Sequence, residues 1–341
     1  MNRRIFTLLA ALIPILILGA VGSAVTVPFV ALGPGPTFDT LGEVGDKPVV
    51  EVRGVPVDET AGHLNMTTVS VRDGLNIFEA FGLWLSGQQG LVPRAEVYPP
   101  GISRDEVDKS NKLDFKRSED NAELAALHYL DMPTVVTVRA VAEDGPSKDA
   151  LKEGDELISL DGKPLTAVQD LLDAAASAKP GSTVPIVIKR DGAEQTVQLT
   201  VGARPDDAEK GYLGVTPTEA AVGPLEVDFN LSEVGGPSAG LIFSLALIDK
   251  LTPGELNGGK FVAGTGTIDP AGKVGPIGGI QYKMIAAREA GAETFLVPAA
   301  NCNEAKQRTP DGLRLVRVET LSGAIESLES INAGKDFPTC E

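Results

Sequence analysis

Gly236-Pro237-Ser238-Ala239-Gly240 is the stretch of this sequence that decides how its carboxyl-terminal third folds. Residues 225–230, just before it, read as a β-strand, and the apolar run that follows to residue 251 is typical of a buried helix. Glycine allows a tight turn between the two elements, and proline suits the first position of a helix. We therefore predict a strand, a glycine-rich turn and a helix, with Ser238 where the helix starts.

The same five residues match the G-x-S-x-G pattern that surrounds the nucleophilic serine of many hydrolases. In an α/β-hydrolase an acid and then a histidine follow this serine, but His63 and His128 both precede Ser238. A triad that uses one of these upstream histidines is a formal alternative. Another alternative is that Ser238 only caps the helix through its hydroxyl group.

A lysine can replace histidine as the base when burial keeps its amine neutral. Lys283 is the candidate, because it lies in a predicted helix over residues 280–290 that follows the glycine pair Gly278-Gly279. Its neighbours at helical spacing are apolar: Ile280, Met284 and Ala287. The alternative is a lysine that extends along the surface into water. If Ser238 is the nucleophile, free N–H groups at the helix start can stabilise an oxyanion.

Four segments, in sequence order, resemble the proteolytic domain of Lon protease: 236–240, Thr265-Gly266, 273–279 and 283–291. The resemblance implies that Ser238 is the nucleophile and that Lys283, four residues after Gly279, is the base. It also implies that Thr265 forms a hydrogen bond near the lysine, with supporting roles for Gly236, Pro237, Gly278 and Gly279. The chain departs from the family at Gly235, where Lon enzymes commonly have aspartate, so any role of that carboxylate is in doubt.

Two earlier parts of the chain extend the resemblance. Residues 62–67 and 118–122 look like the first strand and first helix of the same domain. Between residues 134 and 201, strands, a helix over 168–178 and the stretch Leu151-Lys152-Glu153-Gly154-Asp155-Glu156-Leu157-Ile158 resemble a PDZ domain. The combination is similar to bacterial membrane-anchored Lon-like proteins that carry a PDZ domain.

The predicted fold class is α+β or α/β, with an N-terminal transmembrane helix, a β-rich PDZ-like domain and a Lon-type proteolytic domain. The predicted boundaries are 1–4 for a cytoplasmic end, 5–32 for a transmembrane signal anchor, 48–130 for the first part of the protease domain, 131–205 for an inserted PDZ-like domain and 206–341 for the part with the catalytic pair.

The amino terminus suggests a membrane anchor. No charged residue occurs from Ile5 to Leu32, and Arg3 and Arg4 stand directly before this run. About 20 apolar residues can cross a bilayer, and the arginines should stay on the cytoplasmic side. We therefore expect a single-pass protein of the cell membrane with its domains outside the cytoplasm, and expect residues 33–36 to form a rigid exit from the bilayer. A cleaved signal peptide is the alternative.

The two cysteines, Cys302 and Cys340, are expected to form a disulfide that ties down the carboxyl-terminal tail outside the cytoplasm. A catalytic thiol is the alternative, but neither cysteine has a nearby histidine in sequence.

Composition excludes several classes of function. The formal net charge of -17 disfavours nucleic acid as a partner. Two histidines and two cysteines cannot supply a typical zinc site, so no metal and no cofactor are expected. Residues 266–274 have a loop one residue too long for an ATP-binding P-loop, with valine where serine or threonine belongs, so no ATP is expected either.

The predicted function is an ATP-independent serine endopeptidase that cleaves flexible or unfolded polypeptides outside the cytoplasm. Its expected partners are polypeptide substrates, the lipid bilayer and, from the resemblance only, further copies in a homo-oligomeric ring. The alternative is a PDZ-containing membrane scaffold with a vestigial peptidase fold.

Three further expectations concern local structure. Residues 92–117 contain several prolines and are predicted to form a long loop, followed by a helix over 118–130 that Ser118 caps. The peptide groove of the PDZ-like domain is predicted between the helix over 168–178 and the strand over 135–141. No glycine precedes that strand, so the groove is expected to bind internal segments rather than free carboxyl termini. Residues 212–215 look more like a carboxylate-binding loop, but they follow the predicted PDZ-like unit, and a strand of the protease domain is the alternative for them.

Overall fold

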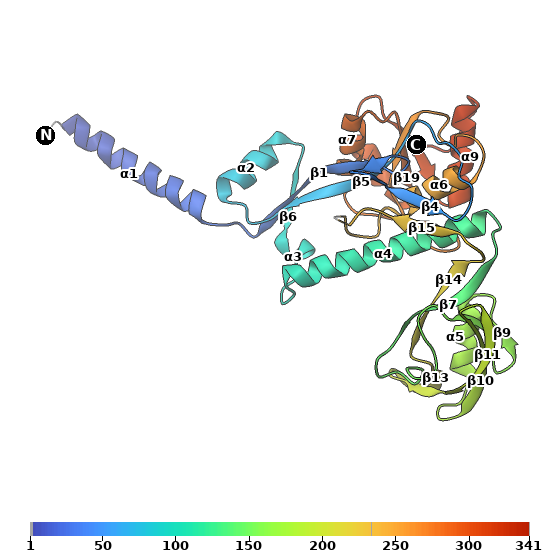
Figure 1. The fold of residues 1–341 in the computed structure, drawn as a ribbon. Coiled ribbons are helices and arrows are strands. Elements are labelled where there is room, and N and C mark those ends of the chain that lie inside the picture. Colours follow the sequence, from blue (N-terminus) through green and yellow to red (C-terminus); the bar gives the residue numbers. More distant parts are fainter. Residues whose placement is uncertain (1–2, 233, 341) are drawn as a thin grey trace. The chain divides into compact units, whose positions relative to one another are not determined.

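The computed structural model describes residues 3–232 and 234–340, with side chains from Ala10 onward. The chain forms two compact units. The first consists of Met1–Val52, Pro56–Ala126 and Val227–Glu341, and the second of Arg53–Val55 and Leu127–Glu226. The second unit is thus inserted, in sequence, within the first (Figure 1).

A six-stranded mixed sheet forms the centre of the first unit. Its strand order is β20 (Arg314–Val318), β19 (Thr294–Pro298), β16 (Phe261–Gly264), β5 (His63–Arg72), β1 (Phe29–Asp39) and β6 (Gly90–Pro93). Neighbouring strands from β20 to β5 are parallel, whereas β1 is antiparallel to both β5 and β6. All five residues of β19 are buried, as is typical of a parallel strand that is covered on both faces.

Helices α6 (Gly240–Leu251), α7 (Ile280–Ala290) and α9 (Leu321–Asn332) belong to the same unit. The first ten residues of α6 are all buried, as expected of a helix that is apolar around its whole circumference. The sequence predicted this buried helix and its end correctly, but the helix starts at Gly240, two residues after Ser238. The predicted bounds of α7 are confirmed residue for residue.

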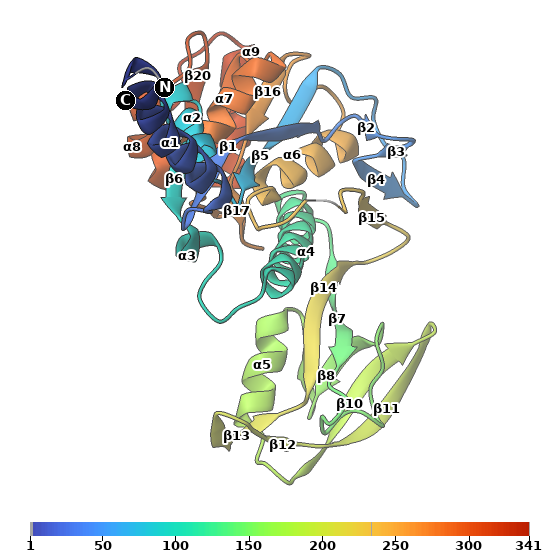
Figure 2. The same cartoon turned by 90° about the vertical axis from the view of Figure 1, so that its left-hand side faces the viewer.

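Residues 92–117 are mostly helical, so the predicted long loop is wrong. They contain the short helix α3 (Arg94–Val97) and most of α4 (Arg104–Tyr129). At the start of α4, Ser103 and Glu106 bond reciprocally to each other's backbone N–H groups, which forms a capping box. Ser118, the predicted cap, therefore lies in the middle of α4, and Figure 2 shows this helix close to α6.

The predicted transmembrane helix over residues 5–32 is wrong. Helix α1 (Arg3–Ala24) ends before the predicted span does, and β1 begins at Phe29. Val30 and Ala31, at the end of the predicted span, are completely buried in the first unit, because they belong to its central sheet. Among the described residues, no helix combines the length and the apolar character that crossing a bilayer requires. Residues 33–36, the predicted membrane exit, also lie within β1.

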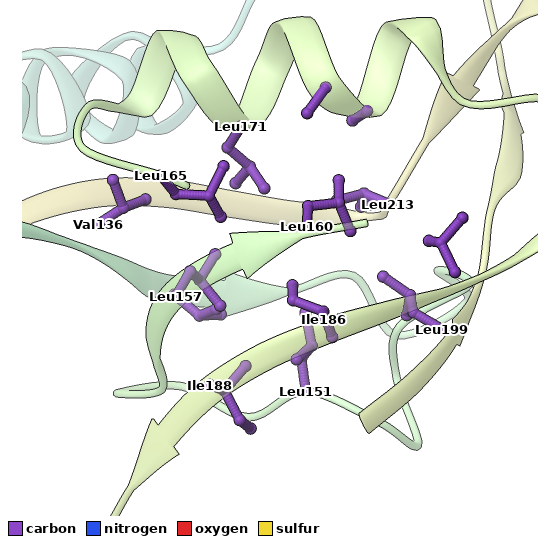
Figure 3. Close-up of a cluster of buried hydrophobic side chains, with 14 of the residues drawn as sticks. Val136, Leu151, Leu157, Leu160, Leu165, Leu171, Ile186, Ile188, Leu199 and Leu213 are labelled. Atoms are coloured by element: carbon purple, nitrogen blue, oxygen red, sulfur yellow. The ribbon is translucent and has the colours of Figure 1, made fainter. Parts of the chain in front are cut away.

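The second unit is an antiparallel sheet with one helix. The strand order is β11 (Ala193–Thr200), β10 (Thr183–Arg190), β8 (Glu156–Leu160), β7 (Thr134–Val141) and β14 (Val215–Ala221), and β9 (Lys163–Pro164) pairs with β8. Helix α5 (Val168–Ser177) covers the core that Figure 3 shows, in which Leu171 from the helix lies near Leu157, Leu160 and Leu165.

The edge strand of this sheet that lies beside α5 is β14 and not β7. Strand β7 pairs with β14 on one side and with β8 on the other, so it has no free edge to receive a peptide. The sequence-based choice of residues 135–141 as the groove strand is therefore wrong. Strand β14 lies beside α5, since the Glu219 carboxylate on β14 accepts a hydrogen bond from the N–H of Val168 at the start of the helix.

The carboxyl-terminal tail is tied down. A disulfide joins Cys302 to Cys340, and the N–H of Arg317 in β20 donates to the carbonyl oxygen of Pro338. The remaining elements are short, apart from α2: α2 (Ile77–Ser86), α8 (Cys302–Ala305), the 3-10 helices η1 (Ala299–Asn301) and η2 (Lys306–Arg308), and strands β2 (Glu43–Val44), β3 (Lys47–Pro48), β4 (Val50–Arg53), β12 (Gly202–Arg204), β13 (Asp207–Tyr212), β15 (Glu226–Phe229), β17 (Thr267–Ile268) and β18 (Val274–Gly275).

Candidate active site

Ser238 lies in the turn that leads into α6, two residues before the helix begins. Gly236 has φ = +87°, a left-handed conformation that glycine adopts without strain. Its N–H donates to the carbonyl oxygen of Asn111 in α4 at 2.8 Å. Pro237 follows and is exposed, whereas Ser238 is half-buried. The turn therefore presents the serine hydroxyl and is itself fixed to α4.

Lys283 reaches Ser238 from helix α7. Its side chain is almost completely buried, with only 3% of the residue exposed, and its Nζ lies 2.8 Å from the Ser238 Oγ. The same Nζ donates to the carbonyl oxygen of Thr67 in β5 at 2.7 Å. The structure thus places the two residues that the sequence singled out within hydrogen-bonding distance of each other.

Burial changes the protonation of Lys283. Desolvation disfavours the charged ammonium form and lowers the pKa of Lys283 from 10.5 to about 7. A substantial fraction of the amine is therefore neutral near neutral pH. A neutral amine that donates one N–H to Thr67 keeps a lone pair with which it can accept a proton from Ser238.

Thr265 holds the backbone of Ser238. This residue follows β16, is completely buried, and donates from Oγ1 to the carbonyl oxygen of Ser238 at 3.0 Å. The N–H of Gly266 donates to the same oxygen at 2.9 Å. Thr265 thus contacts the serine backbone, while the carbonyl of Thr67 is the acceptor for the lysine.

The two glycines before α7 differ in their surroundings. Gly279 has φ = +69°, and a Cβ on it would lie 2.9 Å from a methyl group of Val69 in β5. This glycine therefore allows α7 to approach β5, which carries the acceptor of Lys283. A Cβ on Gly278 would have no other atom within 4 Å, and this residue lines the cleft described next.

A cleft of about 720 Å³ opens beside the Ser238 hydroxyl. Lys283 is the one ionisable side chain on its wall among the described residues. The side chains around it are mainly apolar: Pro36, Phe38, Met66, Val69, Phe115, Val234, Pro276 and Ile277. An extended, uncharged segment of polypeptide matches such a wall, because it buries apolar side chains there without burying an unpaired charge.

Neither histidine belongs to this cleft. The ring of His63 bonds to the carboxylate of Asp39 at 2.6 Å, and that of His128 bonds to the carboxylate of Glu219 at 3.0 Å. The geometry therefore does not support the alternative of a triad with an upstream histidine. In the part of the chain that the structure describes, no group of three potential ligands is placed to hold a metal ion.

Sequence reasoning missed three residues that hold the site together. These are Thr67, whose carbonyl binds the lysine; Asn111, whose carbonyl binds Gly236; and Ser118, whose hydroxyl donates to the carbonyl of Pro237 at 3.1 Å. Thr67 and Asn111 contribute only main-chain carbonyl groups, which leave no mark in a sequence. The capping-box residues Ser103 and Glu106 could have predicted where α4 begins, and this helix carries Asn111 and Ser118.

Comparisons with known families identify two domains. Residues 103–201 match the PDZ domain, and residues 233–328 match the Lon protease (S16) C-terminal proteolytic domain. The second match contains Ser238, Thr265 and Lys283.

Curated relatives match about a quarter of the chain. A probable periplasmic serine endoprotease DegP-like from Pseudomonas fulva (strain 12-X) is 36% identical over 102 residues, which are 29% of this chain and 21% of that protein. Serine endoprotease DegS from Escherichia coli (strain K12) is 34% identical over 88 residues, 24% of this chain and 25% of that protein. The chain thus matches about a fifth to a quarter of the length of these relatives.

Among solved structures, the PDZ domain of the SdrC-like protein from Listeria monocytogenes is 27% identical, with a TM-score of 0.23, and covers 24% of this chain and 86% of that chain. The serine endoprotease from Yersinia pestis is 33% identical, with a TM-score of 0.19, and covers 19% of this chain and 25% of that chain.

Proposed function

We propose that this chain, which carries a PDZ domain and a Lon protease C-terminal proteolytic domain, is a serine endopeptidase with Ser238 as nucleophile and Lys283 as general base. The observation that supports this proposal best is the 2.8 Å contact between Lys283 Nζ and Ser238 Oγ, made by a buried lysine whose pKa is lowered to about 7. A general base is most effective when its pKa lies near the working pH.

The proposed reaction begins with the neutral amine of Lys283, which removes the proton of the Ser238 hydroxyl as its oxygen attacks the carbonyl carbon of the peptide bond. The resulting ammonium group then gives this proton to the leaving nitrogen when the carbon–nitrogen bond breaks. An acyl-serine remains. Lys283 next takes a proton from a water molecule, which attacks the ester, and the released serine oxygen takes that proton back.

Two backbone N–H groups are the candidates for stabilising the oxyanion. Among the described residues, none accepts a hydrogen bond from the N–H of Ser238 or Ala239, which lie directly before α6. The start of a helix also carries a partial positive charge. We assign these two N–H groups to the negative oxygen of the tetrahedral intermediate.

The substrate proposed for this cleft is a flexible or unfolded polypeptide. The mainly apolar wall favours apolar side chains close to the cleaved bond. No step of the proposed reaction uses ATP, and without an unfolding motor a folded domain would not enter a cleft of this size. A homo-oligomeric ring stays a prediction.

The compartment that we propose is outside the cytoplasm. The disulfide between Cys302 and Cys340 is the kind of bond that persists in an oxidising environment. The similarity to proteins named as periplasmic endoproteases points in the same direction.

Hydrolysis of internally quenched peptides by the full chain tests the proposed function. Ser238→Ala and Lys283→Ala should each abolish turnover, and the double variant should be no worse than either single one, because the two side chains act as one unit. Lys283→Arg should also be inactive, since a guanidinium group does not give up its proton. If the wild-type chain does not cleave any member of a diverse peptide set, or if Lys283→Ala cleaves as fast as the wild type, the alternative of a binding protein with a vestigial peptidase fold is favoured.

A second function, peptide recruitment by the PDZ domain, is favoured by the free edge of β14. PDZ domains bind a peptide as an added strand and hold its terminal carboxylate with backbone N–H groups. The residues just before β14 are Leu213 and Gly214, and no described residue accepts a hydrogen bond from either N–H. Gly214 has φ = +71°, which suits a tight loop at this place.

We therefore propose that this loop binds free carboxyl termini, which reverses the sequence-based expectation of internal segments. That expectation depended on β7 as the groove strand, which pairs on both sides. Titration of the inactive Ser238→Ala chain with matched peptides should show tighter binding of the free acid than of the amide. Equal affinities would contradict the proposal.

A further inference from the structure

Ser118 contacts the catalytic turn although neither its predicted capping role nor the proposed reaction uses it. It lies in the middle of α4, only 3% of it is exposed, and its hydroxyl donates to the carbonyl oxygen of Pro237 at 3.1 Å. Asn111, seven residues earlier and so on the same face of the helix, accepts from the N–H of Gly236. Helix α4 thus holds the turn at two successive residues.

The contact with Pro237 fixes the direction of a second group. The peptide unit between Pro237 and Ser238 is planar and trans, so its carbonyl and its N–H point in opposite directions. Because the carbonyl is bound to Ser118 on α4, the N–H of Ser238 must point away from α4. This N–H is one of the two proposed oxyanion donors.

The neighbouring peptide unit is held in the same way. The carbonyl of Ser238 accepts from Thr265 and Gly266, and this fixes the N–H of Ala239, the other proposed donor. Each donor is thus oriented through the carbonyl of its own peptide unit. Thr265 was expected from the family resemblance to act near the lysine, whereas Ser118 was expected only to cap a helix.

We infer that Ser118 is a positioning residue for catalysis, which orients the Ser238 N–H toward the oxyanion by holding the carbonyl of Pro237. This inference depends on the proposed peptidase function. It assigns Ser118 to stabilisation of the tetrahedral intermediate and not to substrate binding, because the residue lies behind the turn and does not line the cleft.

The test compares Ser118→Ala with a matched control, Ser244→Ala. Ser244 is also completely buried and also bridges α4 and α6, since its hydroxyl donates to the carbonyl of Ala122 and to that of Gly240. Neither of these hydrogen bonds involves residues 236–238. Both variants remove one buried hydroxyl from the same helix contact, and only Ser118→Ala releases the turn.

Removal of an oxyanion donor typically slows catalysis by about 10²–10³-fold, and a donor that is present but misdirected should cost less, on the order of 10–100-fold. For Ser118→Ala we expect this loss in kcat with KM within about threefold of the wild type. We also expect an equal loss in affinity for a peptide boronic acid, whose tetrahedral adduct with Ser238 places an oxygen in the oxyanion position. Ser244→Ala should keep the wild-type kcat and the wild-type affinity for the boronic acid. The pH at which the rate reaches half of its maximum should not change in either variant.

The inference is overturned if the wild-type chain is active but Ser118→Ala matches Ser244→Ala in kcat and in boronate affinity. It is also overturned if Ser118→Ala changes KM alone. If the wild type neither cleaves peptides nor binds the boronate, the proposed function fails and the inference fails with it.

Discussion

Lys283→Met should make the folded chain more stable at neutral pH, although it destroys the proposed active site. The lysine is buried with only 3% exposed, and burial lowers its pKa from 10.5 to about 7. Each pKa unit corresponds to about 1.4 kcal/mol, so the buried lysine costs about 4 kcal/mol of folding free energy at pH 7. Methionine has a similar shape and no charge to desolvate.

Part of this gain is offset by lost hydrogen bonds. The bonds of Nζ to the Thr67 carbonyl and the Ser238 hydroxyl disappear, which costs about 2 kcal/mol together. The expected net gain is therefore about 2 kcal/mol at pH 7.

The gain should shrink as the pH rises. Above about pH 7 the folded lysine is neutral, while the lysine of the unfolded chain stays protonated until about pH 10.5. The unfolded wild type therefore binds more protons in this interval, and wild-type stability rises with pH. At pH 9 the remaining cost is about 2 kcal/mol, which the lost hydrogen bonds balance, so Lys283→Met and the wild type should then be about equally stable.

Urea unfolding at pH 7 and at pH 9 measures the difference in the free energy of unfolding between Lys283→Met and the wild type. Lys109→Met, a change at an exposed lysine on α4, is the control and should leave the free energy of unfolding within about 0.5 kcal/mol at both values of pH. If Lys283→Met is destabilising at pH 7, or if its effect does not depend on pH, the burial of a neutral lysine is refuted.

Three other predictions concern stability and the catalytic turn. Replacement of Cys302 and Cys340 by serine should lower the free energy of unfolding by about 4 kcal/mol, because the disulfide closes a loop with a sequence separation of 38. Urea unfolding measures this loss, and an unchanged urea midpoint would contradict it. Gly235→Asp should abolish peptide hydrolysis, since a Cβ at this position would lie 2.9 Å from the Cβ of Asn111. Adding Asn111→Gly to this variant should restore part of the rate. Full activity of Gly235→Asp alone would refute the close approach. Arg190→Met should destabilise the second unit by about 3 kcal/mol, because it leaves the buried carboxylate of Asp155 unpaired. Burial raises the pKa of Asp155, but the hydrogen bonds from Arg190 and from the N–H of Lys152, together with the positive charges of both residues, outweigh this effect and lower the pKa. The stabilisation should therefore be lost as the pH falls below the usual range of aspartate. Circular dichroism during acid titration measures this loss, and identical acid unfolding of wild type and variant would contradict the pairing.

The sequence predicts those elements whose ends carry their own signals. Helix α7 follows a glycine pair and stops at Gly291, and its apolar residues recur at helical spacing, so both of its bounds are predicted correctly. The same periodicity surrounds Lys283 with apolar neighbours, and these prove to be completely buried. Local patterns and the family motifs were therefore sufficient to select the serine and the lysine that the structure brings together.

Elements that depend on distant partners were missed. Strand β1 contains Gly33-Pro34-Gly35-Pro36, a composition typical of loops, yet pairing with β5 and β6 on its two sides makes it part of the central sheet. The apolar residues at the start of β1 resembled the end of a membrane span, because a buried strand and a membrane helix are both apolar. Helix α4 is rich in charged residues, so hydrophobic periodicity gave little indication of its first half.

Contacts that cross the fold could not be predicted either. The carbonyl of Thr67 meets Lys283 across 216 residues of sequence, and the hydroxyl of Ser118 meets Pro237 across 119. Both contacts arise only when α4, α6, α7 and β5 pack together. A serine within a charged helix gives no sign, on its own, that it orients a peptide unit more than a hundred residues away.

The pH dependence of Ser238 labelling tests the central claim most directly. A fluorophosphonate reacts with a serine only when a base removes the hydroxyl proton, and mass spectrometry identifies the labelled residue. We predict that Ser238 is labelled, that the rate rises with pH to half of its maximum near pH 7, where Lys283 loses its proton, and that Lys283→Met is not labelled. Labelling of Ser238 at the wild-type rate in Lys283→Met, or a rate that does not change between pH 5.5 and pH 8.5, would contradict the pairing of these two residues.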